Sequence, residues 1–467
     1  MNPFRAWVRR ATLDAVRRFE VRLERYKLVD RRRIRDELLQ DLVVRHAMEA
    51  HADDTGLDPT AVQRLVERYV DEIVPFFNIL SYYRFGYNSA RILINLLYRP
   101  AVTWEARERL NAIPKRDVVV YLMNHRSNAD YVAVAYVLAK GVSISYAVGE
   151  WARTWPLEYV FKSFGSYFIR RRFREPLYHA VLERYVQLIT RNGVTQGIFL
   201  EGGLSRDGAP RPAKIGLLDY IVRTLDDPAF DRDIWLVPVA INYDRVLEDR
   251  SLIRELVDEQ HRPGRLAQAA GVTRYLTLNL LRLLAGRLRR YGRVAVNFGT
   301  PVSVREWATG HPGVLALPKD ARLPNIQALA DDMLHRVGAI IPVTPVPLAA
   351  AALLSFGETA VRRADLLQRI EDFRDHLAGR DAKLVHADRE PAAILERAWK
   401  TFGMRRVVHR EGGTYVILPR QRPLLEYYAN SIGHLLPRRE RVSAAHPAHE
   451  PDHDLPGLRR PDGPGAR

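Results

Sequence analysis

The chain has 467 residues, and at ~150 residues per domain this length predicts two or three domains. Apolar residues make up 47% of the chain and charged residues 27%, a composition that is typical of a globular protein and excludes a disordered or fibrous one. The 72 basic residues outnumber the 55 acidic ones, for a net charge of +17, so the surface attracts nucleic acid, anionic lipid or phosphorylated substrates. With no Cys, the chain has no disulfide, thiol nucleophile, Cys-ligated zinc or iron–sulfur cluster.

Residues 1–85 are predicted to form an N-terminal helical region, and the first twenty carry no secretory signal. Residues 1–40 hold 12 basic and 6 acidic side chains. The first residues of this region have two interpretations. They form either an amphipathic helix on an anionic membrane surface or a solvated helix packed on its own domain. The apolar residues at helical spacing are Phe4, Trp7, Val8 and Ala11.

From residue 86 to about 345, short apolar runs alternate with helical patterns. This alternation predicts an α/β domain with a mixed, largely parallel sheet flanked by helices. Ligands of such domains bind at the carboxyl ends of the strands. The predicted strands are Val118–Met123, Gly197–Glu201, Ile234–Tyr243 and Val294–Gly299, and the clearest helices between them are Tyr131–Lys140 and Pro176–Gly193.

A long uncharged window, Val337–Gly357, joins this domain to a C-terminal region. Three prolines interrupt it, so we interpret it as a buried or interfacial segment and not as a membrane span. Residues 346–436 are predicted to be mainly helical and end in an aromatic-rich helix, Leu424–Leu436. The tail, 437–467, is rich in Pro and charge and is predicted to be disordered.

None of the 14 histidines has the spacing of a metal-binding motif, so no metal site is predicted. A general base needs a carboxylate that orients its imidazole, and His followed by Asp five residues later is one such pattern. It occurs at His125–Asp130, His376–Asp381 and His449–Asp454. The first of these directly follows a predicted buried strand and precedes a helix, which favours it as a catalytic pair. The plainer alternative is a capped turn with a surface histidine.

Three further segments carry charge or glycine near predicted strands. In GSYFIRRRFRE (165–175), alternation along a strand sends Arg170 and Arg171 to opposite faces, so one face can meet a phosphate. In FLEGGLSRDGAPRPAKIG (199–216), the glycines allow a tight turn and the basic residues offer phosphate donors. In LVPVAINYD (236–244), Pro238 predicts a strand edge or bulge. A solvated basic surface is the alternative for the first two segments.

Taken in order, NHRSNAD, GSYFIRRR, EGGLSRDG and LVPVAIN resemble the four blocks of the acyltransferases of glycerolipid synthesis. Those blocks read H-x-x-x-x-D, F-I-R-R, E-G-G-x-S-R or E-G-T-R, and V-P. The bacterial-type glycerol-3-phosphate acyltransferases are the most similar branch, with the dihydroxyacetone-phosphate acyltransferases nearby. RPAKIG (211–216) and the helix at 424–436 also match that branch, so the resemblance covers residues 86–436.

The resemblance implies that His125 is the general base and that Asp130 orients it. Leu204 departs from the family, which often has Arg there, so Arg206 or Lys214 would carry more of the phosphate contact. The bacterial enzymes are also often much longer at the N-terminus. The substrate-binding residues implied are Arg170, Arg171, Glu201, Gly202, Arg206, Lys214 and Pro238.

The implied activity is transfer of a fatty acyl group to the sn-1 hydroxyl of glycerol 3-phosphate, which gives lysophosphatidate for phospholipid synthesis. Acyl-CoA or acyl carrier protein is the implied co-substrate, no cofactor is expected, and the implied place is the cytoplasmic face of the cell membrane, held peripherally at an anionic surface. Lysophosphatidate and dihydroxyacetone phosphate stay open as acceptors. A non-catalytic basic protein that binds membrane or nucleic acid is the alternative of another class, although no known nucleic-acid-binding pattern is present, so no nucleic-acid partner is expected.

Overall fold

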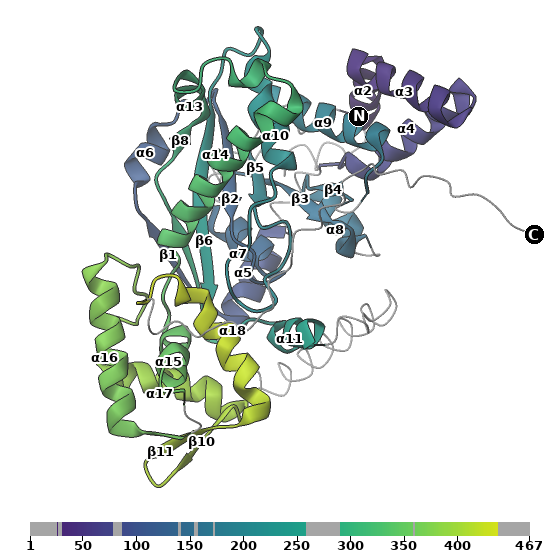
Figure 1. Ribbon diagram of the computed structural model, residues 1–467. Coiled ribbons are helices and arrows are strands. Elements are labelled where there is room, and N and C mark those ends of the chain that lie inside the picture. The colour runs from purple at the N-terminus through teal and green to yellow at the C-terminus, as the bar shows by residue number, and fades with distance from the viewer. Residues whose placement is uncertain are drawn as a thin grey trace, which may run out of the picture.

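The protein is described here by a computed structural model (Figure 1). The amphipathic helix predicted around Phe4 and the predicted tail beyond Pro437 lie outside the described residues. The structure describes Tyr26 and residues 30–77, 86–138, 142–153, 157–170, 173–257, 290–357 and 360–437.

Three helices form the described part of the N-terminal region, and an aspartate precedes each of them. The side chain of Asp41, for example, accepts hydrogen bonds from the first backbone N–H groups of α3, which otherwise have no partner in the helix. The third helix buries valines at helical spacing, among them Val62, Val66 and Val70. The helices are α2 (Arg31–Gln40), α3 (Leu42–Thr55) and α4 (Pro59–Ile73).

An eight-stranded sheet is the centre of the described residues, in the order β1-β7-β6-β2-β5-β3-β4, with β8 paired to β6. The pairs β2–β5, β2–β6, β3–β5, β3–β4 and β1–β7 are parallel, whereas β6–β7 and β6–β8 are antiparallel. The predicted mixed, largely parallel sheet is therefore confirmed. Its strands are β1 (Arg99–Trp104), β2 (Val118–Met123), β3 (Ser145–Gly149), β4 (Tyr167–Ile169), β5 (Gln196–Phe199), β6 (Ile234–Tyr243), β7 (Arg293–Phe298) and β8 (Val302–Ser303).

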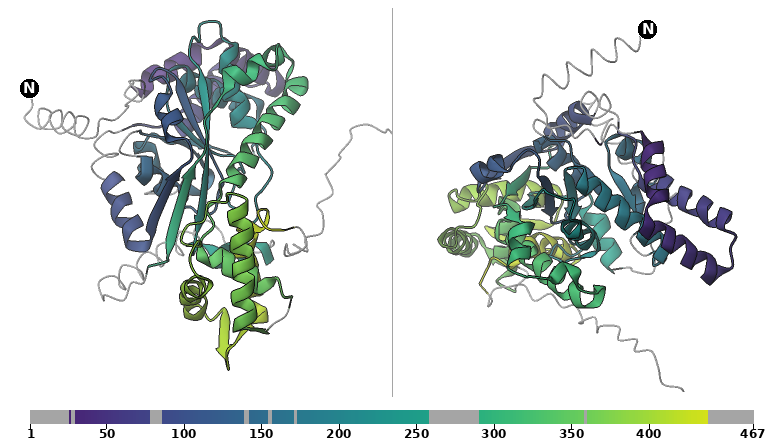
Figure 2. Two further views of the ribbon diagram at one scale, coloured as in Figure 1. Left: turned by 90° about the vertical axis from the view of Figure 1, so that its left-hand side faces the viewer. Right: turned by 90° about the horizontal axis from the view of Figure 1, so that it is seen from above.

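Helices cover both faces of this sheet, as Figures 1 and 2 show. Every residue of β2 is buried, and its side chains alternate between two cores. Val119, Tyr121 and Met123 pack with α5 and α7, while the residues between them pack with α9, α10 and α14. The helices of this domain are α5 (Tyr87–Leu97), α6 (Arg107–Ala112), α7 (Asp130–Leu138), η3 (Glu150–Ala152), α8 (Leu157–Ser163), α9 (Pro176–Arg191), α10 (Gly216–Val222), η4 (Arg223–Asp226), α11 (Asp249–Val257), α13 (Val304–Thr309), η5 (Val314–Ala316) and α14 (Lys319–Ala339).

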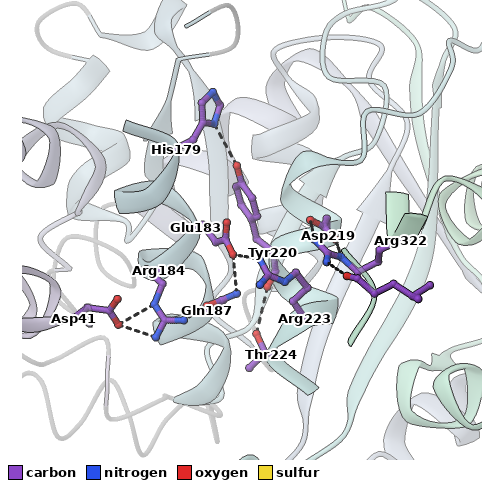
Figure 3. A network of polar contacts seen from close by, with 11 residues as sticks. Asp41, His179, Glu183, Arg184, Gln187, Asp219, Tyr220, Arg223, Thr224 and Arg322 are labelled. Atoms are coloured by element: carbon purple, nitrogen blue, oxygen red, sulfur yellow. Dashed lines mark hydrogen bonds and ion pairs between the residues drawn. The ribbon is translucent and has the colours of Figure 1, made fainter. Parts of the chain in front are cut away.

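Ion pairs join the helices on that second face to one another (Figure 3). Arg184 reaches across to Asp41, the cap of α3, with Nε 2.8 Å from Oδ2. On the far side, Arg322 of α14 pairs with Asp219 of α10 at 2.8 Å, and both side chains are buried. The first of these pairs attaches the N-terminal helices to α9, and the second joins α10 to α14 within the sheet domain.

The C-terminal region is built around α15, whose ten residues are all buried. It lies in the uncharged window, so the interpretation of that window as a buried segment is confirmed. In the part of the chain that is described, no helix has the length and apolar character needed to cross a membrane. Because α15 begins at Pro345, where the predicted sheet domain ends, we retain 86–345 and 346–436 as proposed domain bounds. The elements are α15 (Pro345–Leu354), β9 (Ala360–Arg362), α16 (Arg363–Gly379), α17 (Pro391–Met404), β10 (Val408–Glu411), β11 (Thr414–Ile417), η6 (Pro419–Gln421) and α18 (Arg422–Gly433).

Candidate active site

The carboxyl ends of β2 and β5 meet at one edge of the sheet. The two strands are parallel, with Met123 opposite Phe199. The loop after β2 carries His125, and the turn after β5 carries Glu201. A backbone bond from Ser205 N–H to the carbonyl of His125, 3.0 Å long, joins the two loops. The strand pairing therefore brings the first and third sequence blocks side by side.

The predicted base and its carboxylate are in contact. Nδ1 of His125 lies 3.0 Å from Oδ2 of Asp130, the first residue of α7. The same oxygen accepts the backbone N–H groups of Arg126 and Ser127, at 2.7 and 2.9 Å. These donors stabilise the carboxylate charge and fix its direction. With its Nδ1 proton held by Asp130, the imidazole has Nε2 as its basic nitrogen.

The imidazole is buried, with 1% of its residue surface exposed. It stacks on the ring of Phe199, with centroids 3.9 Å apart, and meets the ring of Tyr131 edge-on at 5.6 Å. A low-dielectric surrounding strengthens the contact between His125 and Asp130. It also means that an alcohol reaches the imidazole only after a covering side chain moves, a step that many enzymes make on substrate binding.

Two further side chains contact this loop, and the sequence analysis missed both. The hydroxyl of Tyr243, at the end of β6, donates to Oδ1 of Asp130 at 2.5 Å. The hydroxyl of Ser127 donates to Glu248 Oε2 at 2.6 Å. Burial raises the pKa of Glu248 and raises that of Tyr243 well above the ordinary value for tyrosine. The one feature of the sequence that could have pointed to Tyr243 and Glu248 is their position just after the fourth block, where a strand next to β2 ends.

The turn after β5 holds Glu201 against the catalytic loop. The carboxyl group accepts the backbone N–H of His125, and burial raises its pKa to about 8, although the nearby Arg126 charge opposes the shift. Its Oε2 is buried and has no hydrogen-bond partner within the described ranges. Gly202 follows with a φ of 65°, and a Cβ there would lie 2.7 Å from the side chain of Lys214, so the turn needs glycine.

The two basic residues predicted in this segment differ in their surroundings, and the stem of Lys214 lies against Gly202. Arg206 lies 3.6 Å from Glu255 of α11, and Lys214 is exposed. The structure thus brings Glu201 and Gly202 to the pair of His125 and Asp130, whereas Arg206 faces α11.

Arg126, next to the predicted base, is a third site residue that was not predicted. Its guanidinium is 3% exposed, lies over the ring of Tyr427 at 4.7 Å, and donates from Nη1 to the carbonyl of Gly208. Nε and Nη2 have no partner among the described residues. Arg126 and Glu201 both line a cavity of about 10 Å³, which is roughly the space of one water. A buried guanidinium edge without a partner is suited to an anion.

The arginine block lies elsewhere. Arg170 follows β4, and its Nε and Nη2 bind both carboxylate oxygens of Glu72 in α4, at 2.7 and 2.5 Å. The rings of Phe173 and Tyr178 lie beside the guanidinium, at 4.6 and 5.5 Å. Arg170 therefore joins the sheet domain to the N-terminal helices, and the structure does not bring it to His125. Arg171 lies outside the described residues.

Pro238 corrects an expectation about β6. The strand lies inside the sheet, where Pro238 pairs with Leu122 of β2, so it is not at an edge. On the other side, β8 pairs with Trp235 and Leu236, and β7 pairs from Val239 onward. The proline thus occupies the change between two partner strands, where its missing N–H interrupts neither ladder.

Metal ligands do not gather in the described ranges: no three His, Asp or Glu side chains there lie close enough to hold an ion. The chemistry that the site offers comes from a buried imidazole, its carboxylate, a guanidinium edge and a carboxyl group of raised pKa.

Two family models match the chain. One, described as acyltransferase, matches residues 106–242, and the other, described as the C-terminal region of glycerol-3-phosphate acyltransferase, matches 277–448. The glycerol-3-phosphate acyltransferase of Aeromonas hydrophila is 29% identical over 439 residues, which are 90% of this chain and 51% of that protein. That of Xanthomonas campestris is 29% identical over 434 residues, 87% of this chain and 46% of that protein.

The chain therefore spans about half the length of the curated relatives that it matches. Among solved structures, the 1-acyl-sn-glycerophosphate acyltransferase of Thermotoga maritima is 17% identical, with a TM-score of 0.31, and the match covers 55% of this chain and 78% of that one.

Proposed function

We propose that the chain is a glycerol-3-phosphate acyltransferase, because two family models and curated relatives of that name match it. In this proposal it moves a fatty acyl group from a thioester to the sn-1 hydroxyl of glycerol 3-phosphate, giving lysophosphatidate for phospholipid synthesis. The observation that carries the proposal is the contact between His125 and Asp130 at the carboxyl edge of β2. The thioester is acyl-CoA or acyl-acyl carrier protein, both of which carry negative charge suited to a chain of net charge +17.

In the proposed reaction, Nε2 of His125 removes the proton of the acceptor hydroxyl while the oxygen of that hydroxyl attacks the thioester carbonyl. Asp130 stabilises the imidazolium that forms. The carbon–sulfur bond then breaks, and the imidazolium returns the proton to the thiolate. The acyl group passes directly to the alcohol, so no acyl-enzyme forms.

Arg126 is our candidate for the group that holds the acceptor's phosphate. Its Nε and Nη2 form the edge of a guanidinium that binds two phosphate oxygens at once, and in this structure that edge has no partner among the described residues. Glu201, buried beside it with a pKa of about 8, is largely protonated at neutral pH and suits a contact with a hydroxyl. Gly202, Arg206, Lys214 and Pro238 stay proposed substrate-binding residues, as does Arg171.

A thiol-release assay with acyl-CoA and glycerol 3-phosphate tests the proposal. We expect His125→Ala and Asp130→Asn to lose about 10²–10⁴-fold in kcat, the range of general base catalysis. His311→Ala, on the exposed end of α13, serves as the matched histidine control and keeps full activity. A folded His125→Ala variant with the wild-type rate would refute the proposal.

The same assay separates the acceptors. Rates with lysophosphatidate and with dihydroxyacetone phosphate, measured beside the rate with glycerol 3-phosphate, distinguish the proposed activity from its two alternatives within the class.

We also propose that the chain works at the cytoplasmic face of an anionic membrane, held peripherally, which the net charge of +17 supports.

A further inference from the structure

Asp130 binds different groups with its two carboxylate oxygens. Oδ2 receives Nδ1–H of His125 and two backbone N–H groups of the same loop. Oδ1 receives the hydroxyl of Tyr243 at 2.5 Å. The tyrosine is 113 residues away along the chain, so its contact is made by the sheet and not by the loop.

Tyr243 is rigidly held. It is the last residue of β6, pairs with Val294 of β7, and has none of its surface exposed. Its ring packs against Tyr98, with centroids 5.3 Å apart. Burial and the charge of Asp130 raise the pKa of its hydroxyl, so the group keeps its proton and can only donate to the carboxylate at physiological pH.

We propose that Tyr243 is a positioning residue of the acyl transfer: its hydroxyl holds Asp130 so that Oδ2 faces the imidazole of His125. The inference rests on the proposed function. Tyr243 exchanges no proton during the reaction. It keeps the carboxylate in place while the imidazolium forms, and it shares the carboxylate charge, which limits how tightly Asp130 binds the imidazolium.

The chain offers a matched control in Tyr427 of α18. Its side chain is also fully buried and also contacts the catalytic loop, but its hydroxyl donates to the backbone carbonyl of Arg126, at 3.3 Å, and not to a carboxylate. Tyr427→Phe and Tyr243→Phe each remove one buried hydroxyl. A purely structural role predicts similar effects, and a positioning role predicts an effect on catalysis for Tyr243 alone.

The experiment compares kcat and KM of both variants with acyl-CoA and glycerol 3-phosphate between pH 5.5 and 9. We expect Tyr243→Phe to lower kcat about tenfold, the effect of one hydrogen bond to a charged group, with KM for glycerol 3-phosphate within about twofold. The acid limb of its pH profile moves to higher pH, because a carboxylate with one donor fewer binds the imidazolium more tightly. Tyr427→Phe leaves the pH profile in place.

Both variants keep the other titratable and charged groups around the pair, so the comparison isolates one hydroxyl. Among the described residues, those groups are Tyr98, Arg126, Tyr131, Glu201 and Glu248, and Tyr427 in the Tyr243→Phe variant.

A second measurement does not depend on activity. In protein with ¹⁵N-labelled histidine, the Nδ1–H resonance of His125, assigned by its loss in His125→Ala, moves in Tyr243→Phe and stays in Tyr427→Phe. An unmoved resonance together with an unmoved pH profile in Tyr243→Phe would overturn the inference. If His125→Ala is inactive in that case, the proposed function stands. If His125→Ala is active, both fail.

Discussion

Arg126 and Arg170 each follow a strand of the same sheet, yet their surroundings are opposite. Arg170 is bound by both oxygens of Glu72, a carboxylate that also pairs with Arg153 at 2.8 Å. Arg126 has no carboxylate within ion-pair distance among the described residues, and two of its nitrogens have no partner. Arg170 thus attaches two parts of the protein to each other, whereas Arg126 keeps a guanidinium edge that is free within the described ranges and suits an anion.

The difference matters energetically. A buried charge without a partner is unfavourable, and proteins keep such groups mainly where a ligand completes them. A guanidinium that already binds a carboxylate with its two-nitrogen edge has no such edge left for a phosphate. The basic character of a segment therefore does not identify its function until the positions of the carboxylates are known.

Among the tests of this comparison, the largest expected effect comes from replacing Arg126 with lysine, with the same change at Arg170 as its counterpart. Arg126→Lys removes the two-nitrogen edge, so KM for glycerol 3-phosphate should rise about 10- to 100-fold, the cost of losing a charged, two-point contact. Arg170→Lys should change it less than about threefold, because Arg170 faces Glu72. Steady-state kinetics of the two variants measure this. An equal rise in both would show that the two regions do not differ in this way.

The next effect concerns Glu201 and pH. Since its pKa is raised to about 8 from an ordinary 4.5, the folded chain keeps a proton that the unfolded chain releases. Stability should therefore fall as pH rises from 4.5 towards 8, by on the order of 2 kcal/mol between pH 6 and pH 8. Glu201→Gln should lack this fall. Urea unfolding of both proteins at the two pH values measures it, and parallel pH dependences would contradict the raised pKa.

The smallest effect is expected from Glu72→Gln, which weakens the attachment region. The partners Arg153 and Arg170 are partly exposed, so solvent screens the pairs, and we expect a loss of about 1 kcal/mol in the free energy of unfolding. Hydrogen exchange should speed up in α4. Asp36→Asn, an exposed ion-pair partner in α2, is the control. A loss no larger than that of the control would mean that Glu72 holds nothing in place.

The sheet shows which elements were predictable. The predicted strands Val118–Met123 and Ile234–Tyr243 are confirmed residue for residue as β2 and β6, because buried central strands form continuous apolar runs. Three strands of the described sheet were not predicted: β1, whose side chains are exposed or half-buried, β3, which is buried but has five residues, and β8, which has two. Pro238 was predicted to mark an edge or a bulge, and the edge was wrong, since the neighbours of a strand cannot be read from its own composition.

The contact between His125 and Asp130 could be expected from the chain alone, since the two residues are five positions apart, across a short loop between a strand and a helix. The contacts of Tyr243, Glu248 and Glu72 could not, because they join residues 113, 121 and 98 positions apart. Charge pairing depends on distance, and over such separations distance follows from the order of the strands and the docking of helices. Local sequence thus specifies the reactive pair, and long-range packing specifies which charges around it are neutralised and which await a substrate.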